Sequence, residues 1–242
     1  MTTRLYVELP LAVGARIELP AAAAHHAAKV LRLRAGEPVV LFNGAGGEYA
    51  GRLAAVSARA ASVELTAYAE PARESPLELV LAQGISRGER MDYTLQKAVE
   101  LGVAAIVPLH TRRCTVQLED ERAAKRLEHW RGVIVHACEQ CGRTRVPRLA
   151  PIATLEEFTA AGPQGAAFCL DPDAAHSLAT AGLSSSAATL VAGPEGGLEA
   201  EEIARLAAAG FTAVRLGPRI LRTETAALVA LAVLQARAGD LV

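Results

Sequence analysis

The chain has 242 residues, of which 51% are hydrophobic and 21% are charged, so it is long enough to bury a sizeable core as one large or two small domains. No apolar run reaches the roughly 20 residues that span a bilayer, which excludes a membrane-spanning helix. The first residues, MTTRLYV, lack the apolar stretch of a signal peptide, so we expect a cytoplasmic protein. The net charge of −1 does not favour nucleic-acid binding.

Residues 1–70 combine short predicted strands with a single predicted helix. The strands are expected over Arg4–Val7, Arg16–Leu19, Val39–Phe42, Glu48–Val56 and Ser62–Ala69. The helix is expected over Ala21–Leu33, directly after Pro20, a residue that favours the first turn of a helix. Many short strands separated by glycine-rich turns predict a small β-barrel, and the polar, proline-containing stretch 70–76 is predicted to be a linker.

The remainder of the chain alternates apolar strands with helices. The strands are expected over Leu77–Ala82, Ala104–Pro108, Ala166–Leu170, Thr189–Ala192 and Ala213–Leu216. The helices are expected over Glu89–Leu101, Asp120–Gln140, Glu199–Ala209 and Thr223–Ala236. Because these strands are too uniformly apolar to have a solvent-exposed face, the pattern predicts an α/β fold with a parallel sheet covered on both sides by helices.

The segment Gly193-Pro-Glu-Gly-Gly197 lies between a predicted strand and a predicted helix. Its three glycines allow a close approach of the backbone to a ligand, and free amides gather near a helix N-terminus. A small-molecule site at the carboxyl end of a parallel strand is one interpretation, and a tight structural turn is the other. The segment is not a P-loop, because no lysine follows the glycines.

A second motif, residues 216–226, also joins a strand to a helix, and Thr223 is the expected N-cap. Arg219 and Arg222 lie beside Glu224 at the start of an almost wholly apolar helix. Charges at a buried helix end are costly unless they serve a purpose. They are therefore either an ion pair that caps the helix or a contact with an anion or a base.

Further motifs have one structural and one functional interpretation each. Lys97 and Glu100 lie three residues apart on one helix face, and the helix is expected to end at Gly102. Residues 143–148 contain three arginines, which form either a basic patch or a solvated turn. Residues 29–34 contain a lysine and two arginines that could hold a phosphate backbone.

No metal site is expected from the cysteines and histidines. Cys138 and Cys141 form a CxxC pair, but no second pair completes a four-ligand site and both fall in a predicted helix. We therefore expect two buried or half-buried helix cysteines. The adjacent His25 and His26 have no carboxylate or cysteine partner and are expected to lie on a helix surface.

Taken together, these motifs resemble those of one family, the bacterial methyltransferases that make N3-methyluridine in 16S ribosomal RNA. The resemblance runs from Arg4 nearly to the C-terminus. It is carried by His25-His26, residues 30–32 and 44–47, Gln96-Lys97, residues 100–102, Glu139-Gln140, Arg143, and residues 193–197 and 216–226. The last two segments, in this order and spacing, are highly specific.

The resemblance implies an enzyme of the SPOUT class that uses S-adenosylmethionine. Residues 1–71 would form a PUA-like RNA-binding β-barrel, and residues 72–242 an α/β domain whose chain ends in a trefoil knot, an exception to the usual unknotted topology. Members of the class are homodimers with the site near the subunit interface. The implied partners are 16S ribosomal RNA, the small ribosomal subunit and a second copy of the chain, without a metal or a membrane.

The resemblance also implies roles for individual residues. Cofactor binding is expected from Leu170, Gly193, Glu195, Gly196, Gly197, Leu216, Gly217, Ile220 and Leu221. RNA binding is expected from Arg4, Lys29, Arg32, Arg34, Arg143 and Arg145. Uridine N3 carries a proton, so a general base is useful, and Glu195 and Glu224 are the candidates. Arg222 first, and Arg219 second, would stabilise the uridine anion.

Two other classes of function stay open at this point. A nucleotide-binding enzyme could use residues 193–197 for phosphates, although the lysine of a P-loop is missing. A non-catalytic RNA-binding or ribosome-assembly protein could use the predicted barrel alone. Binding of adenosine triphosphate would favour the first class, and a lack of S-adenosylmethionine binding would favour the second.

Overall fold

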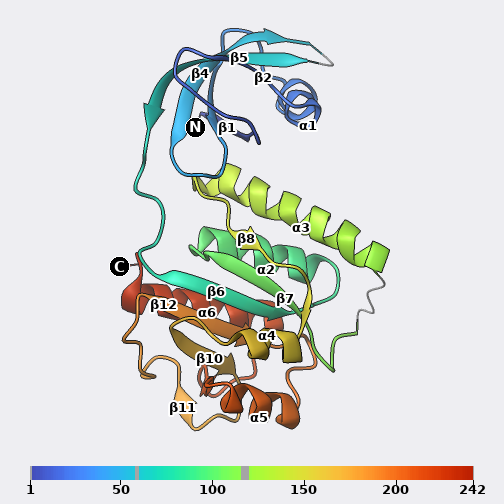
Figure 1. Cartoon of the computed structure of the whole chain (residues 1–242), viewed down its shortest axis with the longest axis vertical. Coiled ribbons are helices and arrows are strands. Elements are labelled where there is room, and N and C mark those ends of the chain that lie inside the picture. The colour runs from blue at the N-terminus through green and yellow to red at the C-terminus, as the bar shows by residue number, and fades with distance from the viewer. Residues whose placement is uncertain (1, 58–59, 116–119, 242) are drawn as a thin grey trace. The chain divides into compact units, whose positions relative to one another are not determined.

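The computed structural model describes residues 2–57, 60–115 and 120–241 (Figure 1). The chain divides into two compact units, Met1–Glu74 with Cys138–Val146, and Ser75–Ala137 with Pro147–Val242. Among the described residues, no helix combines the length and apolar character that crossing a membrane requires.

The first unit is built on a five-stranded sheet with the strand order β1-β3-β4-β5-β2. The strands are β1 (Thr3–Tyr6), β2 (Arg16–Glu18), β3 (Pro38–Phe42), β4 (Glu48–Val56) and β5 (Ala61–Ala69). Strands β1 and β3 are parallel and the other pairs are antiparallel. Leu5, Leu41 and Val63 are at most 1% exposed and form the centre of its core. All five strands agree with the predicted ranges to within one residue at each end.

The single helix of this unit is shorter than predicted. The α-helix α1 covers Ala21–His25, and a π-helical turn follows over His26–Val30. The amide of Leu33 bonds to the carbonyl of Ala27, and Arg32 between them has a φ of 55°. A residue in the left-handed region ends a helix, and glycine or asparagine usually signals it. The prediction that the helix extends to Leu33 is therefore wrong, since Arg32 gave no such signal.

The second unit contains an eight-stranded sheet in the order β11-β13-β10-β12-β6-β7-β8, with β9 also paired to β7, and all its pairs are parallel. The longer strands are β6 (Glu78–Gly84), β7 (Ala105–His110), β10 (Ala166–Leu170), β12 (Ala187–Ala192) and β13 (Thr212–Arg215). The short strands, which the sequence did not predict, are β8 (Arg148–Leu149), β9 (Ala153–Thr154) and β11 (His176–Ser177). The predicted parallel α/β sheet is confirmed.

Helices cover both faces of this sheet. They are α2 (Glu89–Glu100), α3 (Asp120–Cys141), α4 (Leu155–Ala161), α5 (Ala200–Ala208) and α6 (Thr223–Ala238). Leu190 and Val191, neighbours on β12, point to opposite faces and are both 0% exposed. Val191 packs in a cluster with residues of α4 and α5, while α6 contacts α2 and the strands β6 and β12. Helix α4 was not predicted.

The junction of α2 and α6 explains the motif at residues 96–102. Lys97 and Glu100 form the expected ion pair at 2.7 Å. Beyond the end of α2, the buried Gln235 of α6 donates to the carbonyl of Leu101 at 2.8 Å. A β-carbon on Gly102 would lie 2.6 Å from the Gln235 amide nitrogen, so glycine is needed for this close approach. This motif therefore fastens two helices of the second unit together.

Candidate functional site

A cavity of about 680 Å³ opens in the second unit where strands β10, β12 and β13 end. Three segments line it: residues 170–173, 192–200 and 214–224. The carboxyl ends of parallel strands are where α/β proteins bind ligands. Every residue to which the sequence analysis assigned cofactor binding or catalysis lines this one cavity.

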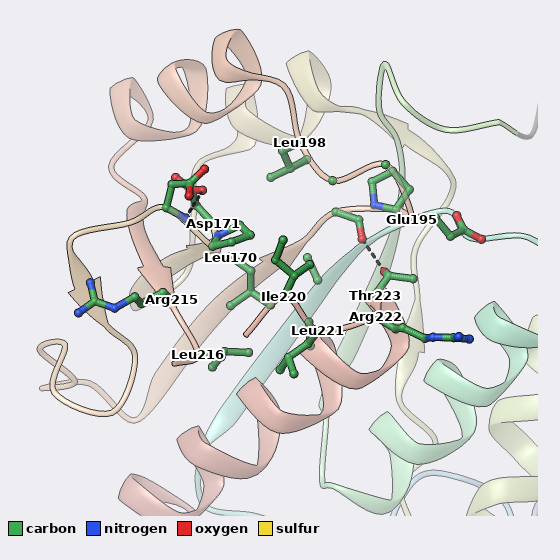
Figure 2. Close-up of a pocket in the computed structure, with 18 of the residues that line it drawn as sticks. Leu170, Asp171, Glu195, Leu198, Arg215, Leu216, Ile220, Leu221, Arg222 and Thr223 are labelled. Carbon is green, nitrogen blue, oxygen red and sulfur yellow. Dashed lines mark hydrogen bonds between the residues drawn. The ribbon is translucent and has the colours of Figure 1, made fainter. Parts of the chain in front are cut away.

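The side chains of the cavity differ along its length (Figure 2). Leu170, Ile220 and Leu221 lie in its central part, and Asp171 lies at one end. Glu195, Thr223 and Arg222 lie at the other end. The side chain of Ile220 is 87% exposed, which is unusual for a large apolar residue unless a ligand covers it. The site thus offers an apolar centre between two polar ends.

The glycine-rich loop after β12 is packed too closely for side chains. A β-carbon on Gly193 would lie 2.9 Å from the carbonyl carbon of Gly197 and 3.0 Å from the amide nitrogen of Leu198. On the neighbouring strand, a β-carbon on Gly84 would lie 2.5 Å from the nitrogen of Pro194. The loop is therefore a fixed backbone surface rather than a mobile turn.

Glu195, in the middle of this loop, is held in its charged form. Its Oε1 accepts hydrogen bonds from the backbone amide of Arg87 at 2.9 Å and from Arg90 Nη1 at 3.1 Å. Burial favours the neutral carboxyl group, but the hydrogen bonds and the Arg90 charge outweigh it and lower the pKa of Glu195. A carboxylate with a lowered pKa is a weakened base.

Arginines after strands β6 and β7 brace the loop, and the sequence analysis did not single them out. Arg113 Nη1 donates to the carbonyl of Gly196 at 2.8 Å, and Arg113 also pairs with Glu199 at 3.7 Å. Arg90 and Arg113 both line the cavity. These arginines are far from the loop in sequence. They lie close to it only because strands β6 and β7 follow β12 in the order of the sheet, so the sequence could not indicate the contact.

Thr223 is the first residue of α6 and not its N-cap, which is Arg222, so the predicted cap is wrong. The Thr223 hydroxyl instead donates to the carbonyl of Gly193 at 2.6 Å. The buried amide of Gln83 donates to the same hydroxyl at 3.1 Å and to the Gly193 carbonyl at 3.3 Å. This network ties the start of α6 to the glycine-rich loop.

We expect Thr223→Val to lower stability, because the valine can neither donate to the Gly193 carbonyl nor accept from Gln83. The Gly193 carbonyl keeps only its longer bond from Gln83, and Gln83 keeps its bond to the Gly84 carbonyl. Each buried hydrogen bond that is lost costs about 0.5–1.5 kcal/mol, which corresponds to a fall of a few degrees in melting temperature. Thermal unfolding followed by circular dichroism measures this. Thr223→Ser keeps the hydroxyl and is the matched control. Equal melting temperatures for the two variants would show that the hydrogen bonds of the Thr223 hydroxyl do not stabilise the protein.

The arginines and the glutamate of the second motif are not paired with one another. Arg219 and Arg222 are exposed, and Glu224 Oε2 is buried without a hydrogen-bond partner among the residues that the structure describes. The ion pair that was one interpretation of this motif is therefore absent among the described residues. All three residues line the cavity, and Glu224 Oε2 is a buried acceptor that no described donor satisfies.

The six residues expected to bind RNA all lie in the first unit, and the side chains of two of them make structural contacts within that unit. Arg4 forms an ion pair with Glu48, donates to the carbonyl of Arg143 at 2.9 Å and stacks on Phe42 at 4.8 Å. Arg143 is 6% exposed and bonds to Glu74 at 2.7 and 2.9 Å. The predicted basic patch or solvated turn is therefore wrong at Arg143.

Four cations of this set remain exposed. Lys29, Arg32 and Arg34 follow α1, and Arg145 lies in the segment 138–146. In the same segment, Glu139 accepts a hydrogen bond from the backbone amide of Tyr6 at 2.9 Å. The motif at residues 139–143 thus holds this segment against the first strand.

The two motif cysteines are free thiols. Cys138 is buried and Cys141 is half-buried, as expected. Burial raises the pKa of the Cys138 thiol to about 12, which keeps it protonated near neutral pH. Within the described part of the chain, no group of three or more histidine, cysteine, aspartate or glutamate side chains could hold a metal ion.

The parallel sheet and its cavity define an α/β protein that binds a small molecule at the carboxyl ends of its strands. The sequence profile of the RNA methyltransferase domain matches residues 73–235, and that of the RNA methyltransferase PUA domain matches residues 19–66. The chain therefore belongs to the RNA methyltransferase family, within the group named ribosomal RNA small subunit methyltransferase E.

Individual relatives cover almost the whole chain. A ribosomal RNA small subunit methyltransferase E from Buchnera aphidicola is 30% identical over 98% of this chain and 97% of its own length. The crystal structure of such an enzyme from Neisseria gonorrhoeae, bound to S-adenosyl methionine, is 40% identical, covers all of both chains and has a TM-score of 0.93. A methyltransferase from Legionella pneumophila, solved with the cofactor SAM, is 40% identical over 99% of both chains with a TM-score of 0.96.

Proposed function

We propose that this protein transfers the methyl group of S-adenosylmethionine to N3 of a uridine in 16S ribosomal RNA of the small ribosomal subunit. The observation that carries the proposal is the single cavity where the glycine-rich loop and the arginine–glutamate motif meet. Full-length similarity to ribosomal RNA small subunit methyltransferases supports the substrate class.

The cavity residues fit this cofactor. Leu170, Ile220 and Leu221 offer apolar surfaces for an adenine ring, and the closely packed backbone at residues 193–197 offers polar groups for its edge. When bound, S-adenosylmethionine supplies a methyl group already activated on a sulfonium. The main task of the protein is therefore to align the nucleophile with that methyl group. Gly193, Glu195, Gly196, Gly197, Leu216 and Gly217 complete the proposed binding set.

The nucleophile requires a base because uridine N3 carries a proton. We assign this role to Glu224 rather than Glu195. The pKa of Glu195 is lowered by its hydrogen bonds to Arg87 and Arg90, which weakens it as a base. Glu224 lines the same cavity, and its buried Oε2 has no hydrogen-bond partner among the described residues, so no described donor competes with a substrate proton for this carboxylate.

Arg222 is the first choice for stabilising the uridine anion, and Arg219 is the second. Both are exposed cations at the cavity, and neither forms an ion pair within the described residues. A guanidinium placed near O2 or O4 would act on the charge that develops as the proton leaves. The target base must be unstacked from its neighbours before it can enter the cavity.

The remaining assignments follow from the family. We infer a SPOUT fold with a trefoil knot for residues 72–242 and a PUA-like barrel that binds RNA for residues 1–71, in a cytoplasmic protein. Lys29, Arg32, Arg34 and Arg145 are exposed and would contact phosphates. Three loops, which follow strands β10, β12 and β13, line one cavity.

The protein should be a homodimer with an interface above roughly 1,000 Å². Helix α6 buries Ala227, Leu231 and Leu234, while Val229 on the same helix stays 38% exposed. On the neighbouring α2, the Tyr93 side chain is 49% exposed. Light scattering at low micromolar concentration should give twice the mass of one chain, and a mass of one chain would contradict the expected dimer.

Isothermal titration with S-adenosylmethionine and with adenosine triphosphate tests the cofactor assignment. We expect saturable binding of the first and none of the second. Adenosine triphosphate binding alone would favour a nucleotide-binding enzyme. A protein that binds 16S ribosomal RNA but neither small molecule would be a non-catalytic RNA-binding protein.

A further inference from the structure

The end of the first helix exposes two neighbouring apolar side chains. Val30 is 60% exposed and Leu31 is 39% exposed. Of the large hydrophobic residues that are exposed in the described part of the chain, these are the only two that follow each other in sequence. On the other side of the same turn, Ala24 and Ala27 are at most 1% exposed and belong to the core of the first unit. Val30 and Leu31 are here called the apolar tip.

The backbone that presents the apolar tip is strained. Val30 is the last residue of the π-helical turn, and the amide of the next residue, Leu31, bonds to the carbonyl of His26 at 2.9 Å. Arg32, with a φ of 55°, is the only residue other than glycine with a positive φ in the described ranges. π-helical turns and non-glycine residues in the left-handed region are strained, and they are found often at functional sites. Glycine at position 32 would remove the strain, so the arginine side chain is retained at a cost in backbone energy. The turn directs Leu33 toward the core and leaves Val30 and Leu31 in solvent.

Three cations lie beside the apolar tip, and one carboxylate, that of Glu37, accepts a hydrogen bond from the backbone amide of Arg34 at 3.2 Å. Lys29, Arg32 and Arg34 are exposed, and none of them forms an ion pair with another described residue. A surface that combines apolar side chains with unpaired cations is complementary to single-stranded RNA, in which unstacked bases offer flat apolar faces beside phosphates.

We propose that Val30 and Leu31 pack against an unstacked base of the substrate RNA while Lys29 and Arg32 hold the adjacent phosphates. This inference rests on the proposed function, since it assigns the first unit a contact with the same RNA. It adds an apolar contact to a surface that would otherwise bind through charge alone. An apolar contact and a phosphate contact differ in their dependence on salt, which makes them separable by experiment.

Binding of the full-length protein to 16S ribosomal RNA transcribed in vitro tests the proposal. Affinity is measured at several salt concentrations for Val30→Ser plus Leu31→Ser, for Val30→Ser alone, and for Lys29→Ala plus Arg32→Ala. Val13→Ser is the matched control, because Val13 is 54% exposed in the same unit and lies outside the apolar tip. Circular dichroism checks that each variant is folded, and calorimetry checks that each still binds S-adenosylmethionine.

The apolar double variant should bind about tenfold more weakly with an unchanged salt slope. Val30→Ser should show part of this loss, Val13→Ser should show none, and the cationic variant should lose affinity with a shallower slope. Normal affinity of the apolar variants beside a weakened cationic variant would overturn the apolar contact but leave RNA binding by this unit intact. Normal affinity of all variants would overturn both. Weaker binding only to intact small subunits, and not to the RNA, would show that the partner is a protein.

Discussion

Gly193→Val should abolish most cofactor binding while leaving the protein folded. The new side chain would begin 2.9 Å from the backbone of Gly197, so the loop must open and lose its fixed surface. Overpacking of this kind costs roughly 1–3 kcal/mol, so the affinity for S-adenosylmethionine should fall by about 5- to 150-fold if the whole cost is expressed in binding. Calorimetric titration measures the affinity.

The matched control is Gly132→Ala, where an added β-carbon has nothing within 4 Å, and it should leave the affinity unchanged. Gly196→Val should also lower the affinity. Its β-carbon would lie 2.9 Å from the β-carbon of Arg113, which moves only with the backbone of that residue. Unchanged affinity in a folded Gly193→Val variant would remove the glycine-rich loop from the cofactor site.

Arg222→Ala should methylate RNA about 100-fold more slowly and still bind RNA nearly as well. Arg222 is the N-cap of α6, but its side chain makes no cap hydrogen bond and forms no ion pair with Glu224 in the described structure, so alanine loses no contact that holds the helix end. The melting temperature should therefore hardly change. Single-turnover methylation with tritiated cofactor, together with a melting curve, separates a catalytic role from a structural one. A destabilised but fully active variant would contradict the catalytic assignment of Arg222.

The sequence predicted the main strands of both units and the position of the glycine-rich loop because these features are local. Apolar periodicity marks a strand, and the order of glycines marks a loop. The contacts that fix the site are not local. Gln83 and Thr223 are 140 residues apart, Arg113 and Gly196 are 83 apart, and Arg143 and Glu74 are 69 apart. Only the order of strands and the packing of loops bring such pairs together, so composition and spacing could not reveal them.

Helix α1 illustrates the same limit in local structure. The sequence between Ala21 and Leu33 has helical periodicity throughout, but Leu33 packs into the core of the first unit through a turn at Arg32. Tertiary packing thus overrides helix propensity, and an arginine occupies a backbone conformation that glycine normally takes. Two of the positions where the local prediction fails, Arg32 and Thr223, lie in segments that we assign to substrate or cofactor.

Nucleoside analysis by mass spectrometry tests the central claim most directly. Small ribosomal subunits or 16S ribosomal RNA that lack the modification are incubated with the protein and S-adenosylmethionine, digested to nucleosides and compared with standards. We predict one new product that co-elutes with N3-methyluridine and is strongly reduced with the Arg222→Ala variant. A methyl group on uridine C5 or on the ribose 2′-oxygen, or no methylated nucleoside from a protein that binds the cofactor, would contradict this account.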